Sequence, residues 1–358
     1  MTWNVTGHER AVSLLSGSIR KGRLSHAYLF LGPEGVGKKT LALELAKAVN
    51  CLQPEPPCGT CPSCRRIAAG HHADVVSYNL SPPGDDAGDA SRKEEQASSG
   101  HREISTDRIK ELQQMAHLSP FEGRKKVFII EDADRLSEEA SNRLLKILEE
   151  PPPAVLILLL ASAARTPQGR QSGRGGLLPT IVSRCQVMEL HPVSFSALEK
   201  TLISTLGFEP KRATFMARIS QGRLGWALRY HQNPELMKKR EEKLTSLIPL
   251  TNAGIEARFT FAARLAEGGP KEWEKVMDTL SLWLSWWRDL LLWKSGSREY
   301  VINLEQEAFL NRQAANLETE QIANALFYLH RAKSQIEARA NMKLALEDLM
   351  LHLPVAAA

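Results

Sequence analysis

The stretch LFLGPEGVGKKTLALELAKAV, residues 29–49, decides the fold class. An apolar run leads into a glycine-rich turn and then into a helical pattern, which is the context of a phosphate-binding loop. Gly32, Gly35 and Gly37 would let backbone N–H groups turn toward a phosphate, and Lys38 would reach its outer oxygens. The sequence therefore predicts a P-loop domain.

The residue after Lys38 departs from this pattern. Such loops carry Ser or Thr there, and the hydroxyl ligates Mg²⁺. Here the residue is Lys39, and Thr40 comes one position late, about 100° further round a helix. We therefore expect impaired metal-assisted hydrolysis, whereas ATP and Mg²⁺ binding as passive ligands stays open.

The acidic strand of the predicted site is altered as well. The run VFIIEDAD (127–134) ends in Glu131 and Asp132, where ATP-hydrolysing P-loop proteins usually have Asp and then Glu. Both carboxylates are present, but the side chain of Glu131 is one methylene longer, and that of Asp132 one methylene shorter, than the usual residue at its position. A simpler interpretation also stays open, in which Asp132 and Asp134 only cap the following turn.

Apolar runs alternate with helical patterns over residues 1–190. The runs at 26–32, 125–134 and 154–162 are continuous, which favours a parallel α/β sheet covered on both faces. Two segments poor in apolar residues, 80–103 and 165–176, are predicted to be mobile surface insertions, and the sequence does not reveal their role.

Beyond residue 191 only helical patterns remain. They predict a small helical domain over 192–245 and a larger one over 252–355. The larger one contains a stripe of tryptophans at helical spacing, Trp273, Trp283, Trp286, Trp287 and Trp293. We expect this stripe to form helix core or a subunit interface, and a stacking platform for bases is the alternative.

Four of the five cysteines lie within residues 51–64: Cys51, Cys58, Cys61 and Cys64. Their spacing offers four thiolates to one tetrahedral Zn²⁺. A site closed by four thiolates keeps no open position, so the sequence predicts a structural zinc module and no metal catalysis.

Composition sets mild limits. The chain has 358 residues, 43% of them hydrophobic, and a net charge of +5, which allows a polyanionic partner without requiring one. The longest apolar stretch, 280–293, is too short to span a bilayer and contains Arg288 and Asp289. With no signal-peptide pattern at the start, we expect a cytoplasmic protein without membrane contact.

Three strings together resemble one family: SHAYLFLGPEGVGKKTLA (25–42), FIIEDADRLSEEASNRLLKILEEPP (128–152) and LLPTIVSRCQ (177–186). With the four cysteines, they are similar to the delta-prime subunits of bacterial DNA polymerase III clamp loaders, which are AAA+ proteins. The resemblance is strong over the first ~190 residues and weaker beyond. It implies an AAA+ α/β domain, then a helical lid domain and an all-helical collar domain.

The resemblance also implies partners. Such a subunit belongs to a hetero-oligomeric ring with gamma/tau-like motor subunits and a delta-like subunit. The ring loads a sliding clamp on primed DNA as part of the DNA polymerase III holoenzyme. Which residues of this chain would touch DNA, and the stoichiometry of the ring, cannot be told from the sequence.

The family's Ser-Arg-Cys motif corresponds here to Ser183, Arg184 and Cys185. The resemblance implies that Arg184 reaches the γ-phosphate bound by the adjacent subunit, as an arginine finger in trans. A guanidinium suits this task because its fork of donors matches phosphate oxygens. The alternative is a surface arginine in an ion pair of little energetic value.

Two further positions follow from the resemblance. Ser162 stands where the family has a small polar sensor residue. The string GRLGWAL (222–228) matches the second sensor pattern, G-x-x-R-x-A-L, but Gly225 takes the place of the arginine, and Arg223 lies on another side of the helix.

The altered loop, acidic strand and second sensor predict a subunit that supplies Arg184 and has no ATPase activity of its own. The rival hypothesis is an ATP-hydrolysing clamp-loader motor or a related DNA-remodelling ATPase. A zinc-stapled DNA-binding protein is a third.

Overall fold

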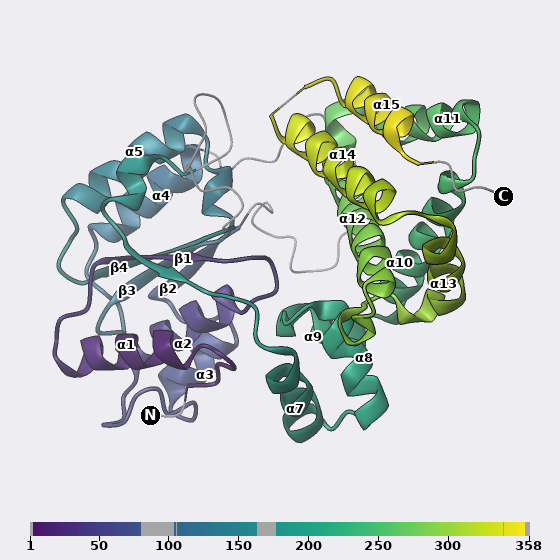
Figure 1. Ribbon diagram of the computed structural model, residues 1–358. Coiled ribbons are helices and arrows are strands. Elements are labelled where there is room, and N and C mark those ends of the chain that lie inside the picture. Colours follow the sequence, from purple (N-terminus) through teal and green to yellow (C-terminus); the bar gives the residue numbers. More distant parts are fainter. Residues whose placement is uncertain (1–2, 80–103, 105, 163–176, 339, 355–358) are drawn as a thin grey trace. The chain divides into compact units, whose positions relative to one another are not determined.

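The structure is a computed structural model that describes residues 3–79, 104, 106–162, 177–338 and 340–354 (Figure 1). The described chain divides into two compact units. The first reaches to Phe208 and includes Gly222–Trp226, and the second comprises Glu209–Gln221 and the chain from Ala227 onward. The two segments predicted to be surface insertions, 80–103 and 165–176, lie outside the described residues.

The first unit is built on one parallel five-stranded sheet with the order β2-β3-β4-β1-β5. The strands are β1 (Ala27–Leu31), β2 (Val75–Tyr78), β3 (Lys126–Ile130), β4 (Val155–Ala161) and β5 (Gln186–Glu189). Every residue of β1, β3 and β4 is buried, whereas the edge strands β2 and β5 are partly exposed. The parallel α/β sheet expected from the continuous apolar runs is confirmed.

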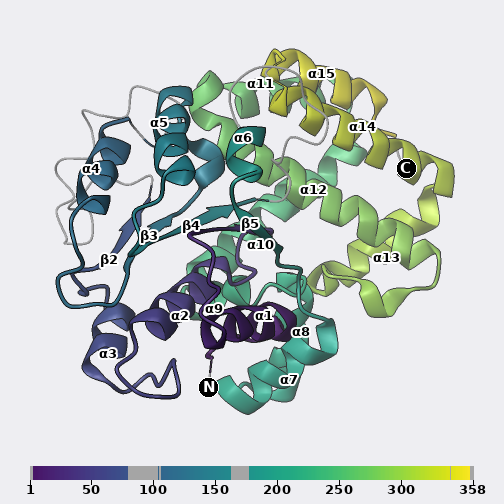
Figure 2. The ribbon, with the colours of Figure 1, turned by 90° about the vertical axis from the view of Figure 1, so that its left-hand side faces the viewer.

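Helices cover both faces of this sheet, because alternate strand residues point to opposite sides. Leu29 and Phe128 pack in one core with α4 and α5, and Tyr28 and Val127 pack in another with α1 and α2. Both views show the sheet between these two helical layers (Figure 1 and Figure 2). The helices of this unit are α1 (Glu9–Arg20), α2 (Lys38–Asn50), α3 (Pro62–Ala68), α4 (Thr106–Ala116), α5 (Glu138–Glu149), α6 (Pro179–Val182) and α7 (Phe195–Leu206).

Local signals set the ends of α5. Ser137 is its N-cap, and the Ser137 hydroxyl accepts a hydrogen bond from Ala140 N at 3.2 Å. The helix ends at Glu149, just before the run of prolines that starts at Pro151, because proline cannot continue the helical hydrogen bonds. The first and last residues of α5 are therefore fixed by the sequence.

The second unit is helical in its described part. Its elements include α8 (Pro210–Ser220), most of α9 (Leu224–Gln232), α10 (Pro234–Leu247), α11 (Ile255–Ala266), α12 (Trp273–Lys294), α13 (Glu307–Asn316), α14 (Thr319–Glu337) and α15 (Met342–His352). Trp283, Trp286 and Trp287 are almost fully buried in the core around α12. Four tryptophans of the stripe, Trp293 included, are thus confirmed as helix core, whereas Trp273 is only partly buried. The rings of Trp283, Trp286 and Trp287 are not available for base stacking.

A buried arginine ties this helical core together. The guanidinium of Arg258 donates to five backbone carbonyls, those of Leu250, Thr251, Met350, Leu353 and Pro354. Burial lowers the pKa of Arg258, and the five acceptors replace the water that the guanidinium loses. The start of α11 is thereby fastened to the C-terminal segment after α15.

The boundaries expected at 1–190, 192–245 and 252–355 remain predictions, since the two compact units do not isolate a separate body over 192–245. Among the described helices, none combines the length and apolarity needed to cross a bilayer.

Candidate functional site

The predicted phosphate loop follows β1 and opens α2, at the carboxyl edge of the sheet. Gly35 and Gly37 have φ values of 78° and 110°, a region that residues with a Cβ rarely adopt. A Cβ at Gly35 would lie 2.5 Å from Cδ1 of Trp226, so the glycine is needed for space as well. The sequence therefore builds the expected strand–loop–helix unit.

Lys38 points back into this loop. Its ammonium donates to the carbonyls of Gly32 and Pro33, the latter at 3.1 Å. Burial lowers the pKa of Lys38, and the carboxylate of Asp134 offsets part of this shift. The amine that would contact a phosphate is thus occupied by the loop's own backbone.

Lys39 meets the acidic strand. Its Nζ lies 2.9 Å from Oε1 of Glu131, the first residue after β3. Thr40, which carries the next hydroxyl along the chain, is exposed on α2. The two altered positions that the sequence singled out, Lys39 and Glu131, are therefore direct partners.

The remaining predicted residues of this site lie at the same edge. Asp132 adopts a left-handed conformation with φ of 49° and precedes a single 3₁₀ turn, Ala133–Arg135. Its side chain makes no capping hydrogen bond there, so the capping interpretation receives no support for Asp132. Ser162 follows β4, whose Ala161 carbonyl accepts from Gly32 N at 3.2 Å.

The second sensor position packs against the loop. Gly225 N donates to the carbonyl of Gly35 at 2.8 Å, and a Cβ at Gly225 would lie 2.8 Å from the same oxygen. Any side chain, and above all an arginine, would therefore displace the loop or this turn. Arg223 lies over the ring of Trp226, with its Cζ 5.5 Å from the ring centroid.

The Ser183–Cys185 motif lies between α6 and β5. Arg184 is partly exposed, with Nη2 2.7 Å from Oε1 of Glu149 and Nη1 donating to Thr180 O at 3.1 Å. Burial raises the pKa of Cys185 to about 12, which keeps the thiol protonated and unreactive. Ser183 donates its hydroxyl to Thr180 O at 3.0 Å.

The glycine loop lies at the carboxyl ends of the strands, whereas Arg184 lies at their amino ends. The loop follows β1, whereas Arg184 precedes β5, and these two strands are parallel neighbours with Tyr28 level with Gln186. At about 3.3 Å per residue, the two sites are on the order of 20 Å apart along the strands. Arg184 cannot serve the phosphate site of its own chain.

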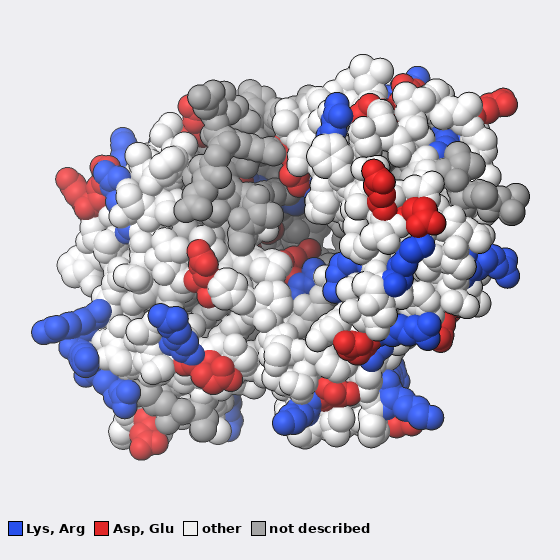
Figure 3. All heavy atoms as spheres, viewed as in Figure 1, with Lys and Arg blue, Asp and Glu red and all other residues white. Residues whose placement is uncertain are grey.

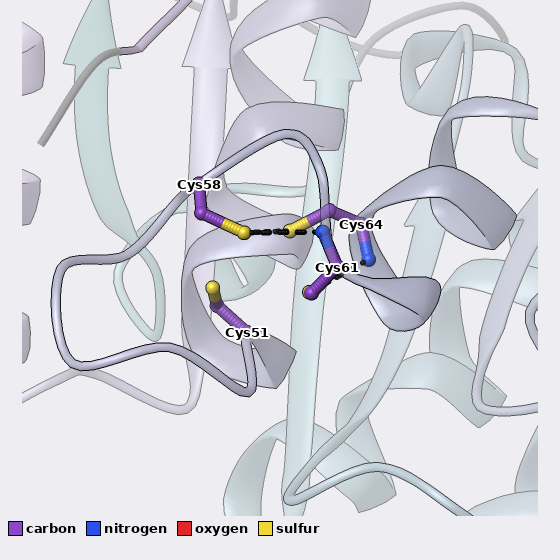
Figure 4. A group of neighbouring side chains, drawn as sticks. All are labelled: Cys51, Cys58, Cys61 and Cys64. Atoms are coloured by element: carbon purple, nitrogen blue, oxygen red, sulfur yellow. Dashed lines mark hydrogen bonds between the residues drawn. The ribbon is translucent and has the colours of Figure 1, made fainter.

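The four cysteines converge on one point (Figure 4). Cys51 caps the end of α2, Cys61 caps the start of α3, and Cys64 lies in the first turn of α3. All four sulfur atoms lie within 4.8 Å of one another, and the distance from Cys58 Sγ to Cys64 Sγ is 3.9 Å. A tetrahedron with Zn–S bonds of about 2.3 Å has edges of about 3.8 Å, so this donor set fits a metal ion.

Hydrogen bonds to sulfur support the same conclusion. Cys61 N donates to Cys58 Sγ at 3.3 Å, and Cys64 N donates to Cys61 Sγ at 3.4 Å. The backbone N–H groups of Cys61 and Thr60 lower the pKa of Cys58 to about 6. Thiolates are the form that ligates metals, so the backbone favours the ligating state of Cys58, whereas burial raises the pKa of Cys64 to about 12.

Asp74 anchors the chain beside this module. Its buried carboxylate accepts hydrogen bonds from the backbone N–H groups of Phe121, Glu122 and Gly123, at 2.7–2.8 Å. Burial alone would raise the pKa of Asp74, but these three donors outweigh it and the pKa is lowered. No local sequence signal indicates this role, because the partners lie 47–49 residues away.

Replacing Asp74 with alanine is expected to lower the free energy of unfolding by about 2–4 kcal/mol, because three buried donors lose their acceptor. A carboxyl group whose pKa is lowered on folding stabilises the folded state at pH values above its pKa in the unfolded chain. This stabilisation is lost as the pH falls through its pKa in the folded state. The stability difference from wild type, measured by urea unfolding, should therefore shrink below about pH 4. Asp107→Ala, at an exposed carboxylate on α4, is the control and should change stability little. A stability difference between Asp74→Ala and wild type that stays constant down to about pH 2 would contradict this account.

Surface charge identifies no nucleic-acid face on the part of the helical unit that is visible. Figure 3 shows Lys and Arg side chains interspersed there with Asp and Glu among the described residues.

The site residue that the sequence interpretation missed is Glu149, the ion-pair partner of Arg184. Its only signal was its place in the string LEEPP (148–152), at the same sheet edge as Arg184.

Comparison with known proteins gives concordant matches. The family model described as DNA polymerase III, delta subunit, matches residues 7–194, and a second model, for the C-terminal part of the delta subunit, matches residues 234–354. The Bacillus subtilis protein DNA polymerase III subunit delta' is 29% identical over 345 residues, which cover 96% of this chain and 95% of that protein. The Escherichia coli subunit tau is 32% identical over 232 residues, 63% of this chain and only 31% of tau.

Among solved structures, a gamma subunit-related protein of Thermotoga maritima is 19% identical over 96% of this chain and 99% of that one, with a TM-score of 0.40. This likeness is too distant to add to the sequence matches. The first family model alone spans more than half of the residues, and the second covers most of the helical part. The chain therefore belongs to the DNA polymerase III delta subunit family.

Proposed function

We propose that this chain is a delta-prime-like subunit of a clamp loader that hydrolyses no ATP itself and supplies Arg184 to the ATP site of a neighbouring subunit. The partners would be gamma/tau-like ATPase subunits and a delta-like subunit in a cytoplasmic hetero-oligomer. The assembly would place a sliding clamp on primed DNA. The full-length similarity to the Bacillus subtilis delta' protein supports this role.

One observation carries the proposal: Arg184 and the chain's own glycine loop lie at opposite ends of the parallel strands. An arginine at the amino ends of the strands can act on a nucleotide phosphate only if another chain presents that phosphate. The guanidinium retains N–H donors beyond those used by Glu149 and Thr180, and it is partly exposed. In ATPases and GTPases, an arginine supplied in trans stabilises the charge that builds up on the transferred phosphoryl group.

The cysteine cluster would hold a structural Zn²⁺. Four sulfur donors match the preference of zinc for thiolates, and a closed set leaves no position for substrate. When bound, the ion would cross-link the end of α2 to the start of α3.

The test is ATP turnover of the purified chain, alone and in the assembly. The chain alone should show none, and turnover should appear when the ATPase subunits, clamp and primed DNA are added. Turnover by the isolated chain that is lost in Lys38→Ala would instead identify an ATP-hydrolysing motor. Salt-dependent DNA binding by the chain alone, without any effect on the assembly, would favour a DNA-binding protein.

A further inference from the structure

Lys39 and Glu131 occupy the two positions at which P-loop proteins hold their magnesium ion. The residue after the loop lysine normally supplies a hydroxyl ligand, and an acid at the end of the acidic strand holds the same ion. In this chain the first position is an ammonium and the second a carboxylate, and they lie 2.9 Å apart. These residues therefore do not fit Mg²⁺.

We propose that the ammonium of Lys39 takes the place of the metal ion and holds the glycine loop closed against the acidic strand. A Lys side chain brings three donors and a positive charge but no acceptor, so it can satisfy Glu131 and cannot ligate a cation. A magnesium ion that approached Glu131 would meet a like charge already bound there. The loop would thus carry an internal cation instead of an exchangeable one.

Other groups of the loop agree with this closed state. Lys38 donates to the carbonyls of Gly32 and Pro33 and so points inward. Gly225 N holds the Gly35 carbonyl at 2.8 Å, where an arginine side chain has no space. The contacts of Lys38 and Gly225 thus engage the loop lysine and the loop backbone, both of which nucleotide binding would use.

The pair lies near the surface, so the core does not depend on the side chain of Lys39. The side chain of Lys39 is 55% exposed and that of Glu131 is 20% exposed. Removing the ammonium leaves Oε1 of Glu131, which is buried, without its charged partner, so the folding of each variant must be verified. Lys39→Thr supplies the missing hydroxyl as well.

The experiment measures binding of a fluorescent ATP analogue to the isolated full chain, with Mg²⁺ and with EDTA. Wild type should show no difference between the two conditions. Lys39→Thr should bind at least about 10-fold more tightly with Mg²⁺, as expected when a metal bridges protein and phosphates. Lys39→Ser is a second variant with the same expectation, and thermal unfolding verifies that both are folded.

Lys110→Thr is the matched control, because Lys110 also lies 2.9 Å from a carboxylate, that of Asp107, and is 47% exposed. It should behave as wild type. The proposal is overturned if wild type already binds more tightly with Mg²⁺, or if both folded Lys39 variants show no effect of Mg²⁺. It extends the proposed lack of turnover in this loop, but the test uses no neighbouring subunit, so its failure leaves the role of Arg184 untouched.

Discussion

Replacing Arg184 with alanine should lower ATP turnover at the neighbouring site of the reconstituted clamp loader by about 1000-fold, the lower end of the range for fingers supplied in trans. The loss follows because the transferred phosphoryl group would lose its bidentate donor. Arg184→Lys should recover only part of the rate, since an ammonium retains the charge but lacks the planar fork. Steady-state turnover with clamp and primed DNA is the measurement.

A suitable control is Arg66→Ala. Arg66 is also a partly exposed arginine paired with a glutamate, with Nη2 2.6 Å from Oε2 of Glu122. A surface pair of this kind contributes about 0–1 kcal/mol, so this variant should assemble and turn over ATP as wild type does. If Arg184→Ala assembles normally and retains full turnover, Arg184 is the surface arginine of the alternative interpretation.

The second large effect concerns the metal. Cys64→Ala should lower the free energy of unfolding of the first unit by at least about 3 kcal/mol, because a buried ligand is lost and the cross-link between α2 and α3 opens. A chelator should destabilise wild type by a similar amount and add little to the variant. Thermal unfolding with and without chelator, together with the zinc content of the purified chain, measures this.

Cys185→Ala is the matched control, because Cys185 is a partly buried thiol outside the cluster. It should retain its zinc and its sensitivity to the chelator. Equal chelator effects on Cys64→Ala and wild type, or a wild-type chain purified without zinc, would contradict a structural metal at these four cysteines.

Much of the first unit could be predicted because its signals are local. The glycine loop and the cysteines of 51–64 each act over a few residues, and each was found where the sequence placed it. The continuous apolar runs likewise follow directly from strands buried on both faces.

The contacts that decide the chemistry could not be predicted in the same way. Lys39 and Glu131 were singled out separately, and their pairing depends on the order of the strands in the sheet, which places the ends of β1 and β3 on either side of β4. Glu149 meets Arg184 because α5 and α6 end at the same edge of the sheet, and no periodicity contains that information. The sequence indicates that Gly225 stands where the family has an arginine. Its contact with Gly35 joins residues far apart in the chain, which only the folded unit shows.

The most direct test of the trans-acting arginine is a structure of the assembled loader with a non-hydrolysable ATP analogue. We predict that the guanidinium of Arg184 lies within about 3 Å of a γ-phosphate oxygen whose nucleotide is held by the glycine loop of the neighbouring subunit. A guanidinium that remains paired with Glu149 and faces solvent, with every bound nucleotide out of its reach, would contradict the account.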